Sequence, residues 1–184
     1  RLVLKSPANQ RSLAAQVRDF LLANKFQGVN LDFENLSDAE YRQVVPFVRV
    51  VADTLYAAGL SVSMDVEAGR PEIPLRELSR ACDFLVIMDY DEHYEGGDPG
   101  PIASIGWFHE VLKKTLAKVP PDKLVVGMGG YGYDWGDGSK EAESITYQTA
   151  LIRAQDNHPE EPPEKIIDFD SDALNATFSY EDDD

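Results

Sequence analysis

Apolar residues recur along the chain in two alternating patterns, one typical of helices and one typical of strands. Apolar positions three or four residues apart predict helices, and these cover residues 7–24, 37–59, 75–80, 104–119 and 142–157. Short apolar runs between them predict strands over 28–33, 60–66, 83–90 and 123–130, with a fifth strand near Ile166. Strands that alternate with helices in this way predict a parallel sheet with right-handed crossovers.

Such a sheet is either open and doubly wound or closed into a barrel. No glycine-rich phosphate loop follows the first strand, which weakens the nucleotide-binding version of the open sheet. Polar residues capable of chemistry follow the carboxyl ends of all four strands, where a TIM (β/α)8 barrel collects its site. Such a barrel needs about 250 residues, whereas this chain has 184. We therefore expect one domain, residues 1–184, of the α/β class, which holds part of a TIM barrel.

The charge of the chain is strongly negative, with 33 Asp and Glu against 17 Lys and Arg and a formal net charge of −16. This charge repels phosphate backbones and anionic membrane surfaces, so nucleic acid and lipid are poor partners. No apolar stretch approaches the roughly 18 residues of a membrane helix, so we expect no membrane insertion by this segment. Cys82 is the only cysteine and precedes an apolar run, which predicts a buried thiol.

Three polar residues occupy alternate positions in the first predicted strand and directly after it: Asn30, Asp32 and Glu34. Side chains alternate across a strand, so all three share one face and the apolar residues between them share the other. The two carboxylates then lie roughly 7 Å apart along the strand. Like charges this close raise one pKa, which keeps an acid protonated and able to protonate a leaving oxygen. The alternative is that these residues lie just past the strand end and face water.

The segment QGVNLDFE, residues 27–34, resembles the D-G-x-D-x-D-x-E motif of glycoside hydrolase family 18, the chitinase family. Asp32 and Glu34 match its last two acids, whereas Gln27 and Asn30 replace its first two aspartates. The resemblance implies that the chain holds strands four to seven of the barrel and the approach to strand eight.

Two further segments resemble the same family, in family order. Met88, Tyr90 and Asp91 in MDYD match its M-x-Y-D motif, and residues 127–132 resemble its seventh-strand segment that ends in Y-G. The longer segments YDEHY and YGYDW resemble a bacterial branch that includes spore-germination hydrolases and barrels fused to polysaccharide deacetylases and glycosyltransferases. The resemblance implies an extracytoplasmic or membrane-associated protein, fused to other carbohydrate-active domains.

The family resemblance implies substrate-assisted retaining hydrolysis of β-1,4-linked polysaccharide or oligosaccharide containing N-acetylglucosamine, chitin-like or peptidoglycan-related. Glu34 protonates the glycosidic oxygen, Asp32 holds the acetamide that attacks the anomeric carbon, and Tyr90 hydrogen-bonds that acetamide. The remaining substrate-binding set comprises Asn30, Met88, Asp91, Tyr131, Tyr133 and Trp135, of which the last three offer flat faces to a sugar ring.

Asn30 is the departure from the family motif that matters most, because the resemblance implies a middle aspartate at this position that shares a proton with the aspartate two residues later. The Asn30 amide can donate a hydrogen bond to Asp32 but cannot take up its charge, which predicts an Asp32 that stays more ionised and a pH dependence that differs from that of a chitinase. Two other functions stay open: a lectin-like protein that binds such sugars without cutting them, and a non-catalytic glycan-binding barrel within a polysaccharide synthesis or modification protein.

Acidic and imidazole groups follow the second and third strands at Glu67, Glu92 and His93. With Asp32 they form a set of ligand types that binds divalent metals. The three histidines of the chain are scattered, however, and loop solvation or sugar hydrogen bonding explains these residues better. We therefore expect neither a metal site nor a cofactor.

Overall fold

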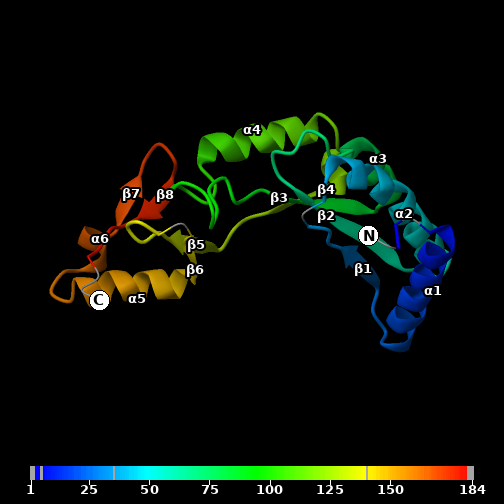
Figure 1. The fold of residues 1–184 in the computed structure, drawn as a ribbon, viewed down its shortest axis with the longest axis horizontal. Helices are drawn as coiled ribbons and strands as arrows, with labels where there is room; N and C mark the ends of the chain where they lie inside the picture. The colour runs from blue at the N-terminus through cyan, green and yellow to red at the C-terminus, as the bar shows by residue number, and fades with distance from the viewer. Residues whose placement is uncertain (1–2, 5, 35, 140, 182–184) are drawn as a thin grey trace. The chain divides into compact units, whose positions relative to one another are not determined.

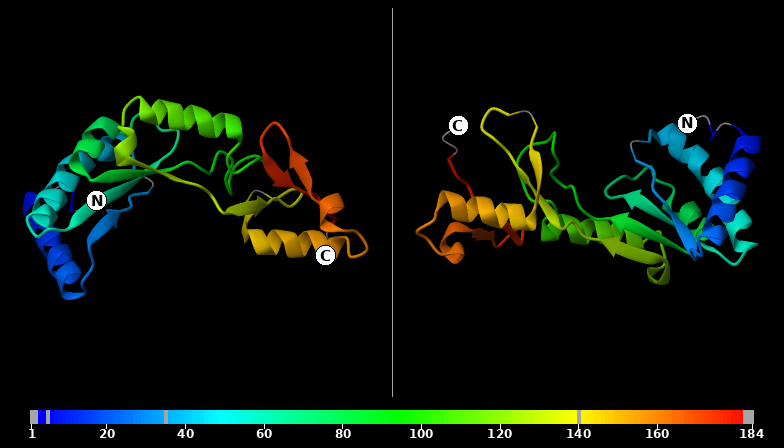
Figure 2. Two further views of the ribbon diagram at one scale, coloured as in Figure 1. Left: turned by 180° about the vertical axis from the view of Figure 1, so that it is seen from behind. Right: turned by 90° about the horizontal axis from the view of Figure 1, so that it is seen from below.

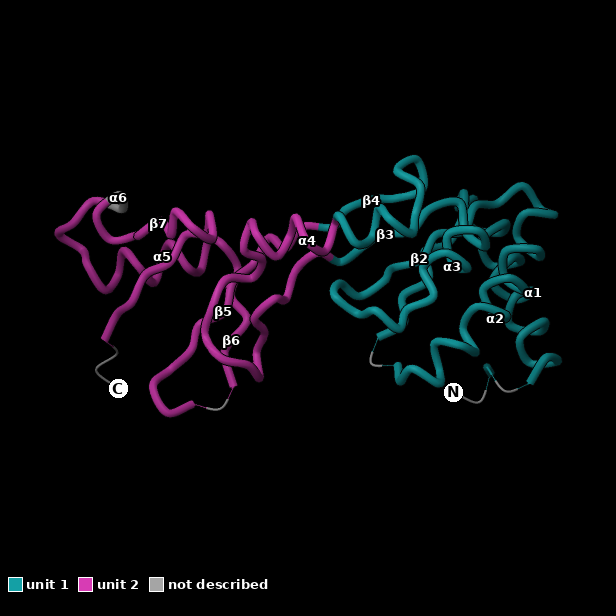
Figure 3. The backbone as a smooth tube through the Cα atoms, turned by 90° about the horizontal axis from the view of Figure 1, so that it is seen from above, with its two compact units in different colours: residues 1–88, 113–127 teal, residues 89–112, 128–184 magenta. Residues whose placement is uncertain are grey.

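The fold comes from a computed structural model that describes residues 3–4, 6–34, 36–139 and 141–181. The chain divides into two compact units, coloured separately in Figure 3. Unit 1 comprises residues 1–88 and 113–127, and unit 2 comprises residues 89–112 and 128–184. Unit 1 therefore carries most of the predicted helix–strand repeats, and unit 2 carries the segments that follow the third and fourth strands.

Unit 1 is built on a four-stranded parallel sheet in the order β1–β2–β3–β4 (Figure 1). Its strands are β1 (Gly28–Leu31), β2 (Ser61–Glu67), β3 (Phe84–Met88) and β4 (Leu124–Gly127), the last preceded by the 3-10 turn η1 (Pro121–Lys123). Strands that neighbour one another in the sheet also follow one another along the chain, as in a (β/α) barrel. The predicted α/β class and parallel sheet are confirmed.

Three helices of unit 1 cover the sheet, two of them in direct contact with it and one packed on another helix. They are α1 (Pro7–Ala23), α2 (Asp38–Tyr56) and α3 (Leu75–Ala81). Helix α2 contacts β2, α3 contacts β3, and α1 packs on α2. The buried core between them is formed by Val44, Val48, Val51, Leu55, Val62, Met64 and Val66. Cys82 is also buried, as predicted, and burial raises the pKa of its thiol to about 11.

Glycine at the start of β1 allows that strand to approach β2 closely. A Cβ atom at Gly28 would overlap the hydroxyl and carbonyl oxygens of Ser61 and would lie 2.9 Å from its carbonyl carbon. Gly28 is also the first residue of β1 in register with β2, opposite Ser61. Any side chain there would push β1 away from the sheet at the point where its pairing begins.

Unit 2 combines helical segments with two antiparallel hairpins. Its elements are the first part of α4 (Ile105–Leu116), then β5 (Tyr131–Asp134), β6 (Glu143–Thr146), α5 (Tyr147–Asn157), α6 (Pro163–Ile166), β7 (Asp168–Asp170) and β8 (Asn175–Thr177). Strand β5 pairs with β6 and β7 pairs with β8. Helix α5 contacts the β5–β6 hairpin, beside which it lies in both views of Figure 2.

Two sequence-based predictions for unit 2 are wrong. Residues 143–146, predicted to begin a helix, form β6, and the helix begins only at Tyr147, where the hydroxyl of Thr146 accepts a hydrogen bond from Thr149 N at 3.1 Å. The strand predicted near Ile166 is found at Asp168–Asp170 as β7, but it pairs antiparallel with β8 instead of extending the parallel sheet, and Ile166 itself ends the helical turn α6. Both errors arise because a hairpin depends on a partner strand that the local apolar pattern does not reveal.

Among the helices in the described ranges, none combines the length and the apolar character that a bilayer span requires.

Candidate functional site

The two candidate acids lie directly after the carboxyl end of β1. The strand ends at Leu31, which pairs with Met64, so Asp32 and Glu34 belong to the following segment and both are exposed. The predicted strand to residue 33 is therefore too long, and only Asn30 of the three polar residues lies within it. The alternative position, just past the strand end and facing water, describes the two acids correctly.

Asn30 is held by the neighbouring strand rather than by Asp32. Its Nδ2 donates to Asp65 Oδ2 at 2.7 Å, and Ser63 Oγ donates to its Oδ1 at 2.7 Å. Ser63 lies opposite Asn30 in the register of β1 and β2, and it is only 7% exposed. The expected hydrogen bond from the Asn30 amide to Asp32 is thus replaced by a bond to Asp65.

Asp65 is a carboxylate that sequence reasoning missed. Its pKa is raised, first by burial and then by the negative charge of Asp32, while the hydrogen bond from Asn30 lowers it. The sequence of β2, SVSMDVE, could have revealed it, because polar residues alternate there with apolar residues that are buried against the helices. Asp65 shares a strand face with Ser63 and therefore lies on the side of the sheet that carries Asn30.

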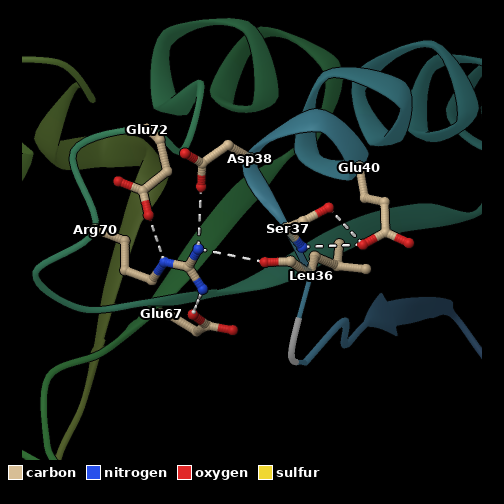
Figure 4. Close-up of polar contacts among 7 residues, drawn as sticks. All are labelled: Leu36, Ser37, Asp38, Glu40, Glu67, Arg70 and Glu72. Atoms are coloured by element: carbon tan, nitrogen blue, oxygen red, sulfur yellow. Dashed lines mark hydrogen bonds and ion pairs between the residues drawn. The ribbon is translucent and has the colours of Figure 1, made fainter.

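Arg70 connects the loop after β2 to the segment that precedes α2 (Figure 4). Its guanidinium donates to Glu67 Oε2 at 2.7 Å and to Glu72 Oε1 at 2.6 Å. It also reaches Leu36 O at 3.3 Å and Asp38 Oδ1 at 3.4 Å. Hydrogen bonds between ionised groups are stronger than neutral ones, so this cluster ties the two loops together at the carboxyl-end side of the sheet.

The start of α2 is fixed by its own capping interactions. The Glu40 carboxylate accepts hydrogen bonds from Ser37 N at 3.0 Å and Ser37 Oγ at 2.7 Å. Arg70 lies over the ring of Tyr41, 5.3 Å from its centroid. Burial, followed by the charge of Glu67, raises the pKa of Tyr41 to about 12. The segment after the acids therefore ends in a well-anchored helix.

Three of the four residues considered as metal ligands have other partners. Glu67 pairs with Arg70, and Glu92 accepts hydrogen bonds from Ser104 N at 2.6 Å and Ser104 Oγ at 3.0 Å. His93 Nδ1 lies 2.9 Å from Asp98 O. Within the part of the chain that the structure describes, no three His, Cys, Asp or Glu residues gather as metal ligands would.

Met88 is the last residue of β3, where it pairs with Glu67 on one side and Gly127 on the other. It is half-buried and ends the parallel pairing of three strands. Unit 1 therefore places Asn30, Asp65 and Met88 in the carboxyl-terminal halves of their strands and Asp32 and Glu34 just beyond the end of β1.

Unit 2 gathers the predicted aromatic residues into a row. Ring centroids are 6.0 Å apart for Tyr90 and Tyr131, 5.6 Å for Tyr131 and Tyr133, and 5.6 Å for Tyr133 and Trp135. Asp91 Oδ1 accepts hydrogen bonds from the hydroxyls of Tyr131 and Tyr133, the latter at 3.2 Å. Burial, then the contacts with Asp91, raises the pKa of Tyr131, so its phenol stays protonated and acts as a donor.

A second feature of unit 2 is a buried acid in the same MDYD segment. Asp89 is 0% exposed, and neither of its carboxylate oxygens has a hydrogen-bond partner among the described residues. It lines a cavity of about 250 Å³ whose wall is largely apolar, with Ile102, Ile105, Phe108 and Met128. Burial raises the pKa of Asp89 from its usual 3.8 to about 6.

Comparisons with known proteins point to one family. The profile of glycosyl hydrolases family 18 matches residues 1–183. The chain is 32% identical to YdhD of Bacillus subtilis over 162 residues, 83% of this chain and 39% of YdhD. It is 27% identical to the cortical fragment-lytic enzyme of Bacillus subtilis over 195 residues, 99% of this chain and 44% of that enzyme. The chain thus spans less than half the length of these curated relatives.

Solved structures agree with that grouping. The crystal structure of YdhD superimposes with a TM-score of 0.87 at 28% identity, covering 98% of this chain and 62% of that one. A chitinase from Chromobacterium violaceum superimposes with a TM-score of 0.83 at 27% identity, covering 97% of this chain and 56% of that one. The predicted TIM-barrel fold, present in part, is confirmed.

Proposed function

Since this chain belongs to glycosyl hydrolases family 18, we propose that it forms part of a glycosidase that cleaves β-1,4-linked polysaccharide containing N-acetylglucosamine, chitin-like or peptidoglycan-related. The observation that carries the proposal is the position of Asp32 and Glu34, two exposed carboxylates directly after the carboxyl end of a parallel strand. Relatives named as a cortical fragment-lytic enzyme and a chitinase support this substrate class.

The proposed reaction is substrate-assisted and retaining. Glu34 gives its proton to the glycosidic oxygen, and the bond from that oxygen to the anomeric carbon breaks. The acetamide carbonyl oxygen of the substrate forms a new bond to the same carbon, while Asp32 holds the acetamide N–H and offsets the developing positive charge. Water then attacks the anomeric carbon, and the bond from that carbon to the acetamide oxygen breaks. A proton of the water passes to Glu34, which restores the acid and leaves the product with retained configuration.

Unit 2 contributes sugar-binding groups in this proposal. Tyr90 hydrogen-bonds the acetamide, and the row of Tyr131, Tyr133 and Trp135 offers flat faces to pyranose rings. Asp91 orients the hydroxyls of Tyr131 and Tyr133, which both donate hydrogen bonds to its carboxylate. In unit 1, Met88 and Asn30 complete the substrate-binding set at the strand ends.

The experiment is the release of reducing ends from N-acetylglucosamine oligomers by the full-length protein and by Glu34→Gln. We expect the variant to lose cleavage by at least about 100-fold while it still binds the oligomer, because general acid catalysis contributes about 10²–10⁴-fold. Glu77→Gln makes the same chemical change at an exposed position of α3 and should cleave at the parent rate.

Asn30 and Gln27 keep one other function in view, a glycan-binding barrel without catalysis in a polysaccharide synthesis or modification protein. Oligomer binding by the parent without any release of reducing ends would favour that function. A parent that neither binds nor cleaves these oligomers would refute the proposed substrate class.

A further inference from the structure

Asn30 stands where the family motif has an aspartate, yet a carboxylate lies within hydrogen-bond distance of it on the next strand. Asn30 Nδ2 and Asp65 Oδ2 are 2.7 Å apart, and Ser63 fixes the amide from its other end at 2.7 Å. With Oδ1 engaged by a hydroxyl, the amide must present its N–H₂ group to Asp65. The contact is therefore oriented, with the amide as donor and the carboxylate as acceptor.

Register places Asp65 beside Asp32 as well. Leu31 pairs with Met64 at the end of β1, so Asp32 follows Leu31 just beyond that end, as Asp65 follows Met64 within β2. Neighbouring strands lie about 4.8 Å apart. Asp65 therefore lies next to both residues of the N-x-D segment that precedes Glu34.

We propose that Asp65 takes the role of the missing motif aspartate and shares a proton with Asp32, as a positioning residue for the reaction. This inference rests on the proposed function, because it assigns Asp65 a task only if Asp32 holds the acetamide. The proton moves between the Asp65 and Asp32 carboxyl groups, so one of the pair is protonated while the other is ionised. Asn30 has no proton to lose and keeps its hydrogen bonds throughout.

Electrostatics within unit 1 favour this pairing. Burial is the main cause that raises the pKa of Asp65, and the hydrogen bond from Asn30 lowers it; the charge of Asp32 adds a smaller rise, in the direction expected when two carboxylates share one site. The other groups around Asp65 do not replace Asp32 as its partner. From β2, Ser63 is engaged by Asn30 and Glu67 by Arg70, and from β3 the residue opposite Asp65 is the apolar Val86.

The decisive experiment removes the carboxylate of Asp65 from β2 and, in a second variant, also introduces one at position 30 of β1, both in the full-length protein. Asp65→Asn should lower kcat on N-acetylglucosamine oligomers by at least about tenfold with little change in KM, and should shift the acidic limb of the pH–kcat profile. The double variant Asn30→Asp with Asp65→Asn returns one carboxylate to the trio at the motif position. It should recover most of the lost kcat. Ser63→Ala, which removes the other contact of Asn30 but keeps Asp65, is the matched control and should keep the parent pH profile.

The outcomes separate this inference from the proposed function. A parent that cleaves, with Asp65→Asn matching its kcat and pH profile, would overturn the role of Asp65 and leave the proposed function intact. A parent that does not cleave would overturn both. If Asp65→Asn does not fold, as judged by circular dichroism, Asn30→Asp alone decides. Added beside Asp65 and Asp32, that third carboxylate should shift the acidic limb of the profile, and an unchanged limb would refute the pairing.

Discussion

Asp89 offers a quantitative test of the structure, because a buried acid that meets no hydrogen-bond partner among the described residues makes stability depend on pH. Its folded-state pKa of about 6 lies above its usual value of 3.8. As pH rises between these values the unfolded chain releases the proton while the folded chain still holds it. The free energy of unfolding therefore falls as pH rises from about 4 to about 6 and is flat above that range.

The size of the effect follows from the same two values. A tenfold difference in acid constant corresponds to about 1.4 kcal/mol, so a rise from 3.8 to about 6 corresponds to about 3 kcal/mol. This is a large share of the total stability of a domain, which is about 5–15 kcal/mol. Asp89→Asn removes the ionisable group and should remove this loss, so the variant should gain stability over the parent as pH rises.

The assay is urea unfolding of the full-length parent and variant from about pH 4 to about pH 7, across the range where the two forms of the acid differ. Tryptophan fluorescence suits it, because Trp107 and Trp135 both belong to unit 2, as Asp89 does. Asp89→Leu is the control for packing: it should shift stability by a different constant amount but show the same change with pH. A variant-minus-parent difference that stays constant with pH would refute the reasoning.

Two other predictions concern contacts of unit 1, and thermal or urea unfolding of the full-length protein checks both. Arg70→Gln should lower the free energy of unfolding by about 2 kcal/mol, because it removes charge-assisted hydrogen bonds that hold two loops together. Arg18→Gln removes an exposed ion pair with the next residue and should lower it by less than about 1 kcal/mol. Equal losses would contradict the importance of the Arg70 cluster. Gly28→Ala should lower the free energy of unfolding by more than about 3 kcal/mol, since its Cβ would overlap backbone atoms of Ser61. At Gly106 a Cβ meets nothing within 4 Å, so Gly106→Ala should leave stability unchanged or raise it by up to about 1 kcal/mol. A Gly28→Ala variant as stable as the parent would show that β1 can move.

The sequence by itself determined the repeating architecture of unit 1. Apolar residues of helical and strand spacing are local features, and each of the helices and strands predicted there is found within a few residues of its predicted position. The same local pattern identified Asp32 and Glu34 as candidate acids of a parallel strand, although it extended that strand to residue 33, and it identified the aromatic segment after β4. These predictions need only the order of residues, because the spacing of apolar residues and the residue types of turns are properties of short stretches of sequence.

Only the tertiary structure decided which side chains meet. Asn30 and Asp65 are 35 residues apart, and their contact depends on the register of two strands, which one sequence does not specify. The β5–β6 hairpin, the Arg70 cluster and the burial of the Asp89 carboxylate have the same character, since each depends on segments brought together by packing. The acids of the candidate site were therefore readable in the sequence, whereas the partner that would complete them was set by the sheet.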